Sequence, residues 1–271
     1  MTYIRLDYLD IATAALLIGV NAVLSIVYDL GLVRRLFVAA IRMVVQLLLV
    51  GLVLKALFAA ASPPLTGAAV AVMVAFAGYE VTARQSRTFE GWWMPGIGAA
   101  SMLVAGVTVT LLALTTQIRP DPWHDPRYAV PLLGMVLGNA MTGVSVGLER
   151  LLSAAARERP AIEARLALGD TFAAATSGVR REAVRSGLIP TINSMSAAGV
   201  VFLPGMMTGQ ILAGVEPAQA VKYQILILFL IAGGTGLGVV VAVVAASRRL
   251  TDDRHRLRLD RLRPIRHISG P

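Results

Sequence analysis

Long apolar runs alternate with short polar segments along the whole chain. A helix needs about 20 mostly apolar residues to cross the hydrocarbon core of a bilayer. Seven runs meet that requirement and predict seven transmembrane helices. They cover residues 9–28, 36–58, 64–81, 92–115, 129–148, 189–212 and 223–246. The expected fold is an all-α polytopic membrane protein, and the third run is the shortest.

Arginine and lysine residues gather in every second segment between the predicted helices. The rich segments are 34–35, 84–87, 150–185 and 248–266, and the opposite segments hold Arg5, Arg119, Arg127 and Lys222. Cytoplasmic loops of membrane proteins carry such an excess of positive charge. The pattern therefore places the N-terminus outside and the C-terminus in the cytoplasm.

Composition agrees with this membrane assignment. The 271 residues are 56% hydrophobic and 15% charged, with a mean hydropathy of +0.70 and a net charge of +9. Soluble domains are closer to one quarter charged. The chain has no cysteine, which excludes disulfides and zinc–thiolate sites. No cleavable signal peptide is visible, so the first run is expected to stay as a span.

The basic C-terminal segment could contact nucleic acid or lie at the membrane surface. Its sequence, RRLTDDRHRLRLDRLRP, follows directly after the last predicted span and contains no aromatic residue for base stacking. An orientation signal that also touches anionic lipid is the simpler interpretation. We expect a transmembrane domain at 1–246, a basic cytoplasmic tail at 247–271 and no nucleic-acid partner.

The longest polar segment, residues 149–188, is predicted to be a cytoplasmic loop with two helices. Pro160 suits the first turn of a helix and Gly169 suits its end. A second helix is expected from Phe172 toward Ser186. The centre of the first helix reads EARLALG, from Glu163 to Gly169.

The chain is not expected to be an enzyme. A P-loop requires Gly-x-x-x-x-Gly-Lys-Ser/Thr, and neither of the two lysines, Lys55 and Lys222, follows a glycine. No nucleophile–base pair or metal motif of an intramembrane enzyme stands in a predicted span. If ATP is used, a separate subunit must bind it together with Mg²⁺.

The string EARLALG resembles the EAA loop of ABC-transporter permeases, Glu-Ala-Ala-x-x-x-Gly, with Arg165 departing at the third position. Four further strings, RMVVQLLLVG, GNAMTGVSVGLERL, LIPTINSMSAAGVVFLPGMMTGQILAG and AVKYQILILFLIAGGTG, are similar to the FetB family of iron-export ABC permeases. That family includes plant aluminium-tolerance relatives. The resemblance covers nearly the whole chain and is densest from 131 to 236.

The resemblance implies a function and partners. Glu163, Ala164 and Gly169 would belong to a coupling helix that docks on a cytoplasmic ABC ATPase. The chain would be the permease subunit of an exporter in the bacterial inner membrane, paired with a second copy of itself and two ATPases. Iron, aluminium tolerance and nucleotide sugars have all been proposed within the family, so the substrate stays open.

The sixth predicted span carries polar residues and a Pro-Gly pair inside an apolar run. Polar side chains at membrane depth are tolerated where they face protein or a water-filled path. Pro204 followed by Gly205 predicts a break in the helix, and transporters use such breaks to bind ions. The candidate path residues of this span are Asn193, Ser196, Pro204, Met206, Met207 and Gln210. The alternative is that these side chains only pack between helices.

The fifth predicted span offers a second polar face. Asn139, Thr142 and Ser145 lie on one side of a helix, with Glu149 at its cytoplasmic end. The alternative is a tight helix crossing, since Gly143 and Gly147 form a small-xxx-small pattern.

The second predicted span carries Arg42 and Gln46 one turn apart. Arg42 could extend to the cytoplasmic surface or pair with Glu80 or Glu149. We include Arg42 and Gln46 among the candidate path residues.

No metal cage is evident, and the metal ligands stay unknown. Iron sites draw on histidines and carboxylates. Of the three histidines, His124 lies in an outer loop with Asp121 and Asp125, and His255 and His267 lie in the tail. A metal exporter, an ABC permease for an organic substrate such as a nucleotide sugar, and an ATP-independent secondary transporter therefore remain as alternatives.

Overall fold

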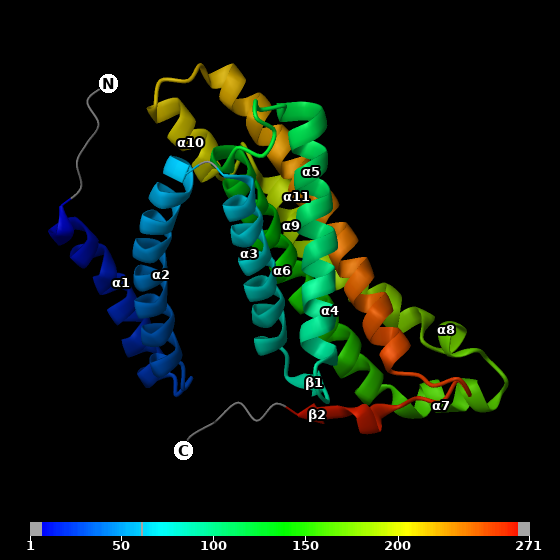
Figure 1. The fold of residues 1–271 in the computed structure, drawn as a ribbon. Helices are drawn as coiled ribbons and strands as arrows, with labels where there is room; N and C mark the ends of the chain where they lie inside the picture. Colours follow the sequence, from blue (N-terminus) through cyan, green and yellow to red (C-terminus); the bar gives the residue numbers. More distant parts are fainter. Residues whose placement is uncertain (1–6, 61, 265–271) are drawn as a thin grey trace. The chain divides into compact units, whose positions relative to one another are not determined.

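The computed structural model describes residues 7–60 and 62–264 (Figure 1). They form two compact units, one up to residue 60 and one from Ser62 onward. Arg5, Arg266 and His267, which the sequence analysis used, lie outside the described residues.

The first unit is a pair of helices. Helix α1 (Tyr8–Val27) is joined to α2 (Val33–Ala60) by a turn in which Asp29 and Gly31 have φ of 50° and 63°. The Leu32 N–H donates to Ser25 Oγ at 2.9 Å and ties the turn to α1. Both helices match the predicted spans 9–28 and 36–58.

The second unit holds the other long apolar helices. These are α3 (Pro63–Ala83), α6 (Pro126–Arg157), α11 (Pro217–Arg249) and a continuous rod made of α4 (Trp93–Met102), η1 (Leu103–Thr108), α5 (Val109–Leu112) and η2 (Ala113–Ile118). The η1 and η2 segments are π-helical turns. Within the described residues, six stretches are long and apolar enough to cross a membrane. The chain is an all-α polytopic membrane protein, as predicted.

The predicted span 189–212 is wrong as a single helix. Helix α9 (Ser177–Ala197) ends inside it, and α10 (Gly205–Leu212) begins only after residues 198–204. The loop helix predicted from Phe172 toward Ser186 is also wrong as an element separate from the sixth span. Helix α8 (Phe172–Ala175) is a single turn, and α9 carries the helix-forming residues 179–186 directly into the apolar run.

Helix α6 extends well beyond the predicted limit at residue 148 and ends at Arg157. The buried face of the helix continues beyond the predicted span, because its last turns still bury apolar side chains: Leu148, Leu151, Leu152 and Ala155. The predicted loop 149–188 is therefore mostly helical: α6, α7 (Arg159–Ala167), α8 and α9 follow one another with short connections.

Helices α6, α9 and α11 pack closely because glycines face one another where they cross. A Cβ atom placed on Gly143 of α6 would lie 2.7 Å from the Gly187 carbonyl oxygen of α9 and 2.6 Å from Thr235 Cγ2 of α11. A Cβ on Gly147 would lie 3.2 Å from Val239 Cγ1. The tight crossing expected at Gly143 and Gly147 is confirmed.

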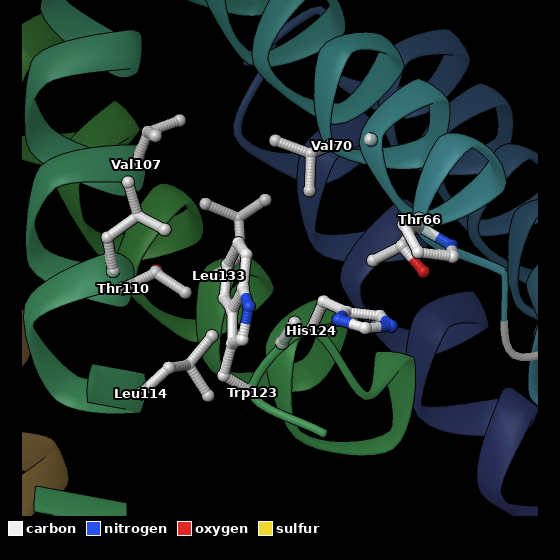
Figure 2. A pocket seen from close by; sticks show the side chains of 12 residues that line it. Thr66, Val70, Val107, Thr110, Leu114, Trp123, His124 and Leu133 are labelled. Carbon is white, nitrogen blue, oxygen red and sulfur yellow. The ribbon is translucent and has the colours of Figure 1, made fainter. Parts of the chain in front are cut away.

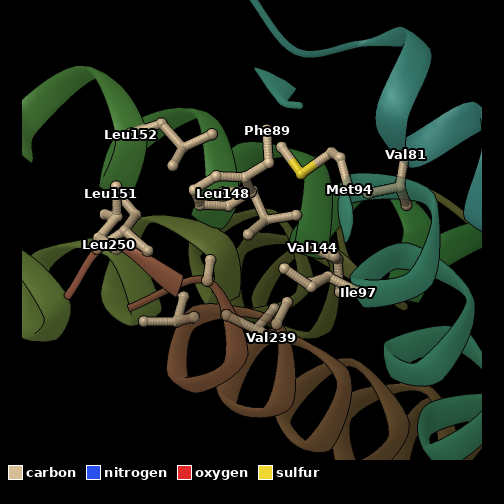
Figure 3. Packing of buried hydrophobic residues seen from close by; sticks show 14 of the residues in the cluster. Val81, Phe89, Met94, Ile97, Val144, Leu148, Leu151, Leu152, Val239 and Leu250 are labelled. Carbon is tan, nitrogen blue, oxygen red and sulfur yellow. The ribbon is translucent and has the colours of Figure 1, made fainter. Parts of the chain in front are cut away.

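One end of the second unit, which we call the α7 end, carries α7 and a small strand pair. Strand β1 (Arg87–Phe89) pairs antiparallel with β2 (Leu262–Pro264), after the short η3 turn (Leu259–Arg261). Figure 3 shows the core beneath them, where Phe89 and Met94 pack among Leu148, Leu152 and Leu250. Phe89 is 1% exposed, so the β1 connection is anchored in the core.

Candidate functional site

The chain leaves helical geometry between α9 and α10. Ala198 is extended at ψ 133°, Gly199 has φ +83°, and Pro204 is extended at ψ 137° directly before α10. The Gly199 N–H donates to the Phe202 carbonyl at 2.9 Å, which closes a local turn. The break predicted at Pro204 and Gly205 is confirmed, and it begins earlier, at Ala198.

A pocket of about 630 Å³ lies beside this break, and we call it the break pocket. Its walls come from the end of α9, the break, α10 and α11. It is lined by Met195, Ala198, Gly199, Leu203, Pro204, Met207, Val221, Gln224, Ile225, Leu228 and Phe229. Of the predicted path residues, Pro204 and Met207 line it.

Gln224 is a lining residue that the sequence analysis missed. It is 7% exposed, and its Oε1 accepts no hydrogen bond from any described residue. A buried carbonyl oxygen without a donor costs about 1–3 kcal/mol. The available signal was a lone amide inside a long apolar helix.

The other predicted residues of the sixth span lie outside this pocket lining. Asn193 and Ser196 are exposed, and Ser196 Oγ donates to the Ile192 carbonyl at 2.9 Å. Met206 packs against the buried cluster of α5, α6 and α11. Gln210 is half-buried, and its Oε1 has no hydrogen-bond donor among the described residues. Their role in a path stays a prediction.

A second pocket of about 540 Å³ opens on the α6–α9 face toward the α7 end, and we call it the Glu149 pocket. It is lined by Arg84, Thr142, Ser145, Val146, Glu149, Arg150, Ser153 and Ser186. The expected shared face of Thr142, Ser145 and Glu149 is therefore present. Asn139 is exposed one turn away on α6, with its Nδ2 donating to the Met135 carbonyl at 2.8 Å.

Hydrogen bonds fix the Glu149 carboxylate at the wall of this pocket. It accepts from Ser86 N at 2.7 Å, from Ser86 Oγ at 2.5 Å and from Ser153 Oγ at 2.8 Å. The two arginines at the pocket are within 4 Å of carboxylates: Arg150 lies 3.6 Å from Glu182, and Arg84 lies 3.9 Å from Glu80. The pocket thus has side chains of both signs of charge in its walls.

The predicted coupling residues lie on α7 and at its end. Glu163 pairs with Arg159 at 2.8 Å, and the Ala164 carbonyl accepts from Leu168 N at 3.1 Å. Gly169 has φ +96°, a conformation that side chains disfavour, and turns the chain away from the helix. The helix expected from Pro160 to Gly169 is confirmed.

Arg165, the departure from the motif, has a structural role. Its guanidinium pairs with Asp170 at 2.7 Å across the turn at Gly169. Leu168, between them, is 88% exposed. The turn therefore holds a large apolar side chain in an open position.

Arg42 and Gln46 lie on α2 in the first unit. Arg42 is exposed and Gln46 is half-buried, and they are one turn apart as expected. Both alternatives for Arg42, extension to the cytoplasmic surface and pairing with Glu80 or Glu149, stay predictions.

Among the described residues, no three His, Asp, Glu or Cys side chains lie close enough to hold a metal ion. His124 instead stacks edge-on against Trp123 at 5.6 Å between ring centroids. Figure 2 shows both rings at an apolar pocket of about 210 Å³ between α3, α5 and α6, with Val70, Val107 and Leu133 around them. The connection between η2 and α6 thus packs His124 against apolar side chains.

Sequence comparisons place the chain among known membrane proteins. Residues 8–251 match a family described as "Uncharacterised protein family (UPF0014)". The UPF0014 membrane protein slr1647 of Synechocystis is 36% identical over 257 residues, which cover 94% of this chain and 97% of the relative. No solved structure matches the chain.

Two further relatives carry names that mention a process. The "Probable iron export permease protein FetB" of Escherichia coli is 31% identical over 254 residues, or 94% of this chain and 96% of the relative. The "Protein ALUMINUM SENSITIVE 3" of Arabidopsis thaliana is 30% identical over 222 residues, or 82% and 79%. The matched length and identity show that this chain belongs to the UPF0014 family of membrane proteins.

Proposed function

We propose that this protein is the permease subunit of an ABC exporter in the bacterial inner membrane, with the α7 end in the cytoplasm and the N-terminus outside. The observation that carries the proposal is the broken helix α9–α10 with a pocket beside it. Breaks at membrane depth free backbone groups for a transported ligand, and they let the two half-helices move separately.

The Glu149 pocket supplies the cytoplasmic mouth of the path. Its polar wall, with Thr142 and Glu149, receives the substrate before it reaches the break pocket. Asn139, Asn193 and Ser196 are exposed polar side chains on α6 and α9, the two helices that wall this mouth. They contribute hydrogen-bonding groups to the path, and Gln210 does so from α10.

Helix α7 couples this path to an ATPase. ATP and Mg²⁺ bind the separate ATPase, and closure of its dimer pushes on α7 through Glu163, Ala164 and Gly169. Helix α6 precedes α7 with a single intervening residue, Glu158, and α9 follows through α8. Movement of α7 therefore reaches both helices of the Glu149 pocket. Two permease copies form the complete pore, and Arg42 and Gln46 of α2 line it.

The proposed substrate is iron or a similar metal ion, in line with the name of the bacterial relative. The donors in the break pocket are the Gln224 amide, the Met207 thioether and the backbone groups of the break. Such a set suits transient passage of an ion and not tight binding. Met195, near the end of α9, adds a second thioether to the same lining.

A specific observation favours a second candidate, an organic substrate such as a nucleotide sugar. The break pocket encloses about 630 Å³, and no charged side chain stands among its lining residues. That volume falls in the range of pockets for drug-sized molecules.

The deciding experiment measures ATPase activity of the permease reconstituted with its ATPase, across metal ions and UDP-sugars. Stimulation by Fe²⁺ that falls at least tenfold in Gln224→Ala and Met207→Ala supports metal export through the break pocket. Gln219→Ala is the matched control, since Gln219 is exposed on the same helix. If only a UDP-sugar stimulates the ATPase activity, the substrate is organic and the proposal of iron export is wrong. No association with any ATPase overturns the ABC assignment.

A further inference from the structure

The segment Thr251–Pro264, which we call the tail segment, is folded onto the α7 end. Residues Arg87, Thr88 and Phe89 of β1 pair with Pro264, Arg263 and Leu262 of β2. Leu257, Leu259 and Leu262 pack against the buried core cluster. The tail segment is thus a fixed part of this end of the protein (Figure 1).

Most guanidinium groups of the tail segment are already paired within the protein. Arg261 Nη1 donates to the carbonyls of Arg249 and Thr251, both at 2.9 Å. The remaining pairs are Arg256 with Asp252 at 2.7 Å, Arg258 with Asp260 at 2.7 Å and Arg263 with Glu90 at 2.5 Å. Each of these arginines therefore already has a partner within the protein.

Arg254 differs from the other arginines of the segment. Its side chain is exposed and makes no hydrogen bond or ion pair with another described residue. Its backbone N–H donates to Asp252 Oδ1 at 3.1 Å, which holds it in the turn next to His255. His255 has φ +56°, so the chain reverses sharply at this point.

The turn forms one wall of a groove of about 370 Å³, and α7 forms the other; we call it the tail groove. The α7 side contributes Glu163, Leu166 and Asp170, and the turn contributes Arg254, His255, Arg256 and Leu257. Glu163 and Asp170 are already paired with Arg159 and Arg165. The charge that the groove leaves unpaired is therefore the Arg254 cation.

The same surface presents an exposed leucine. Leu168, at the end of α7, is 88% exposed and lies two residues before the groove residue Asp170. Tryptophans gather at membrane–water interfaces, so we expect the membrane surface at this end to lie near Trp92 and Trp93. Arg249 lies 4.4 Å from the centroid of the Trp93 ring. The tail segment begins just beyond Arg249, so it lies on the water side with α7. A leucine exposed to water there fits a protein partner.

We propose that the tail groove and Leu168 together form the docking surface for the ATPase subunit, with the tail segment as a second wall beside α7. This rests on the ABC permease function proposed above. The partner surface must offer an apolar recess for Leu168 and a carboxylate for Arg254. Strand β2 is paired to β1, which lies in the α3–α4 connection. An ATPase docked on the tail segment is therefore linked through β1 to the Ser86–Glu149 contact at the Glu149 pocket.

The test compares binding of detergent-solubilised permease variants to the ATPase, measured by co-purification and titration. Arg254→Glu and Leu168→Ala should each weaken binding roughly tenfold. The matched controls are Arg127→Glu and Leu212→Ala, which alter an exposed arginine and an exposed leucine away from α7 and the tail segment. Both controls should bind like the parent protein.

A second measurement does not depend on weakened binding. The chain has no cysteine, so His255→Cys gives a single attachment point for a photoreactive maleimide. Illumination should cross-link it to the ATPase.

The outcomes separate two failures. If the unaltered permease binds no ATPase, the proposed function fails. If it binds but Arg254→Glu, Leu168→Ala and the cross-link all show no effect, the tail groove is not the docking surface. Loss of binding to vesicles of anionic lipid in Arg254→Glu, with ATPase binding intact, would assign the turn to the membrane and overturn the inference.

Discussion

Ser86 donates two hydrogen bonds to the Glu149 carboxylate, one from its backbone N–H and one from its hydroxyl. Ser86 lies just before β1, and Glu149 lies on α6, far away in the sequence. The pair therefore ties the α3–β1 connection to the helix that carries the Glu149 pocket. Any movement of β1 relative to α6 must stretch or break these two bonds.

The first prediction concerns the strength of this tie. Glu149→Gln removes the negative charge that strengthens the hydrogen bonds from Ser86 and Ser153. We expect a loss of about 1–3 kcal/mol in the free energy of unfolding, since hydrogen bonds to charged groups are among the stronger ones. The midpoint of thermal unfolding, followed by tryptophan fluorescence in detergent, should fall. Ser153→Ala, which removes a single donor, should lower it less; equal midpoints for Glu149→Gln and the parent would contradict the prediction.

The second prediction concerns the crossing of α6, α9 and α11. Gly143→Ala would bring a Cβ within 2.7 Å of the Gly187 carbonyl oxygen, too close for any real contact. The helices must separate, and overpacking of this kind costs about 1–3 kcal/mol. Thermal unfolding in detergent should show a clear loss. Gly138→Ala on the same helix is the control, since a Cβ there meets nothing within 4 Å. A loss of the same size at both positions would show that the crossing does not set the effect.

The third prediction concerns the turn after α7. Nothing lies within 4 Å of a Cβ at Gly169, so Gly169→Ala acts only through the backbone at φ +96°. Holding a non-glycine residue in a sparsely populated backbone conformation costs about 1–3 kcal/mol. We expect the turn to shift, membrane insertion to persist and stimulation of the ATPase to fall.

Gly178 offers the matched control for that change. It has the same open surroundings as Gly169 and lies in the first turn of α9. Gly178→Ala should leave stimulation unchanged, because alanine favours a helix. A charge-reversal substitution at Glu163 tests the coupling role at a second position, within α7 itself. Full stimulation in both Gly169→Ala and the Glu163 variant would remove α7 from the coupling role.

Most of the long helices could be predicted from the apolar runs, because only a long apolar stretch is stable in the hydrocarbon core of a membrane. Five of the seven predicted spans correspond to single helices, and the fourth corresponds to the α4–η2 rod. The sixth failed as one helix because Gly199 and Pro204 impose local backbone conformations that a hydropathy window averages away. The Pro-Gly pair still indicated the break itself.

The pockets were less predictable, because they depend on which faces meet. Thr142 and Glu149 could be grouped from helical spacing alone. Gln224 was missed, since only the packing of α11 against the break places this residue in the lining of a pocket. The tail segment was interpreted from its charge, yet its folding depends on Leu257, Leu259 and Leu262 and on pairing with β1 far along the chain. Charge composition carries no information on such distant partners.

The last prediction concerns the pH range over which the tail segment stays folded. The hydrogen bond from Arg256 lowers the pKa of Asp252, and the hydrogen bond from Arg258 lowers the pKa of Asp260 to about 2. Both pKa values lie below those of the unfolded chain. Their stabilising contribution is therefore complete above about pH 4 and is lost as the pH falls toward the folded-state values. A spin label on His255→Cys should show unchanged mobility from pH 7 to pH 5 and rising mobility between about pH 4 and pH 2. Asp252→Asn should raise mobility already at pH 7, whereas Asp253→Asn, on the exposed neighbour, should not. A label that is equally mobile at every pH would contradict the folded tail segment and the docking surface built on it.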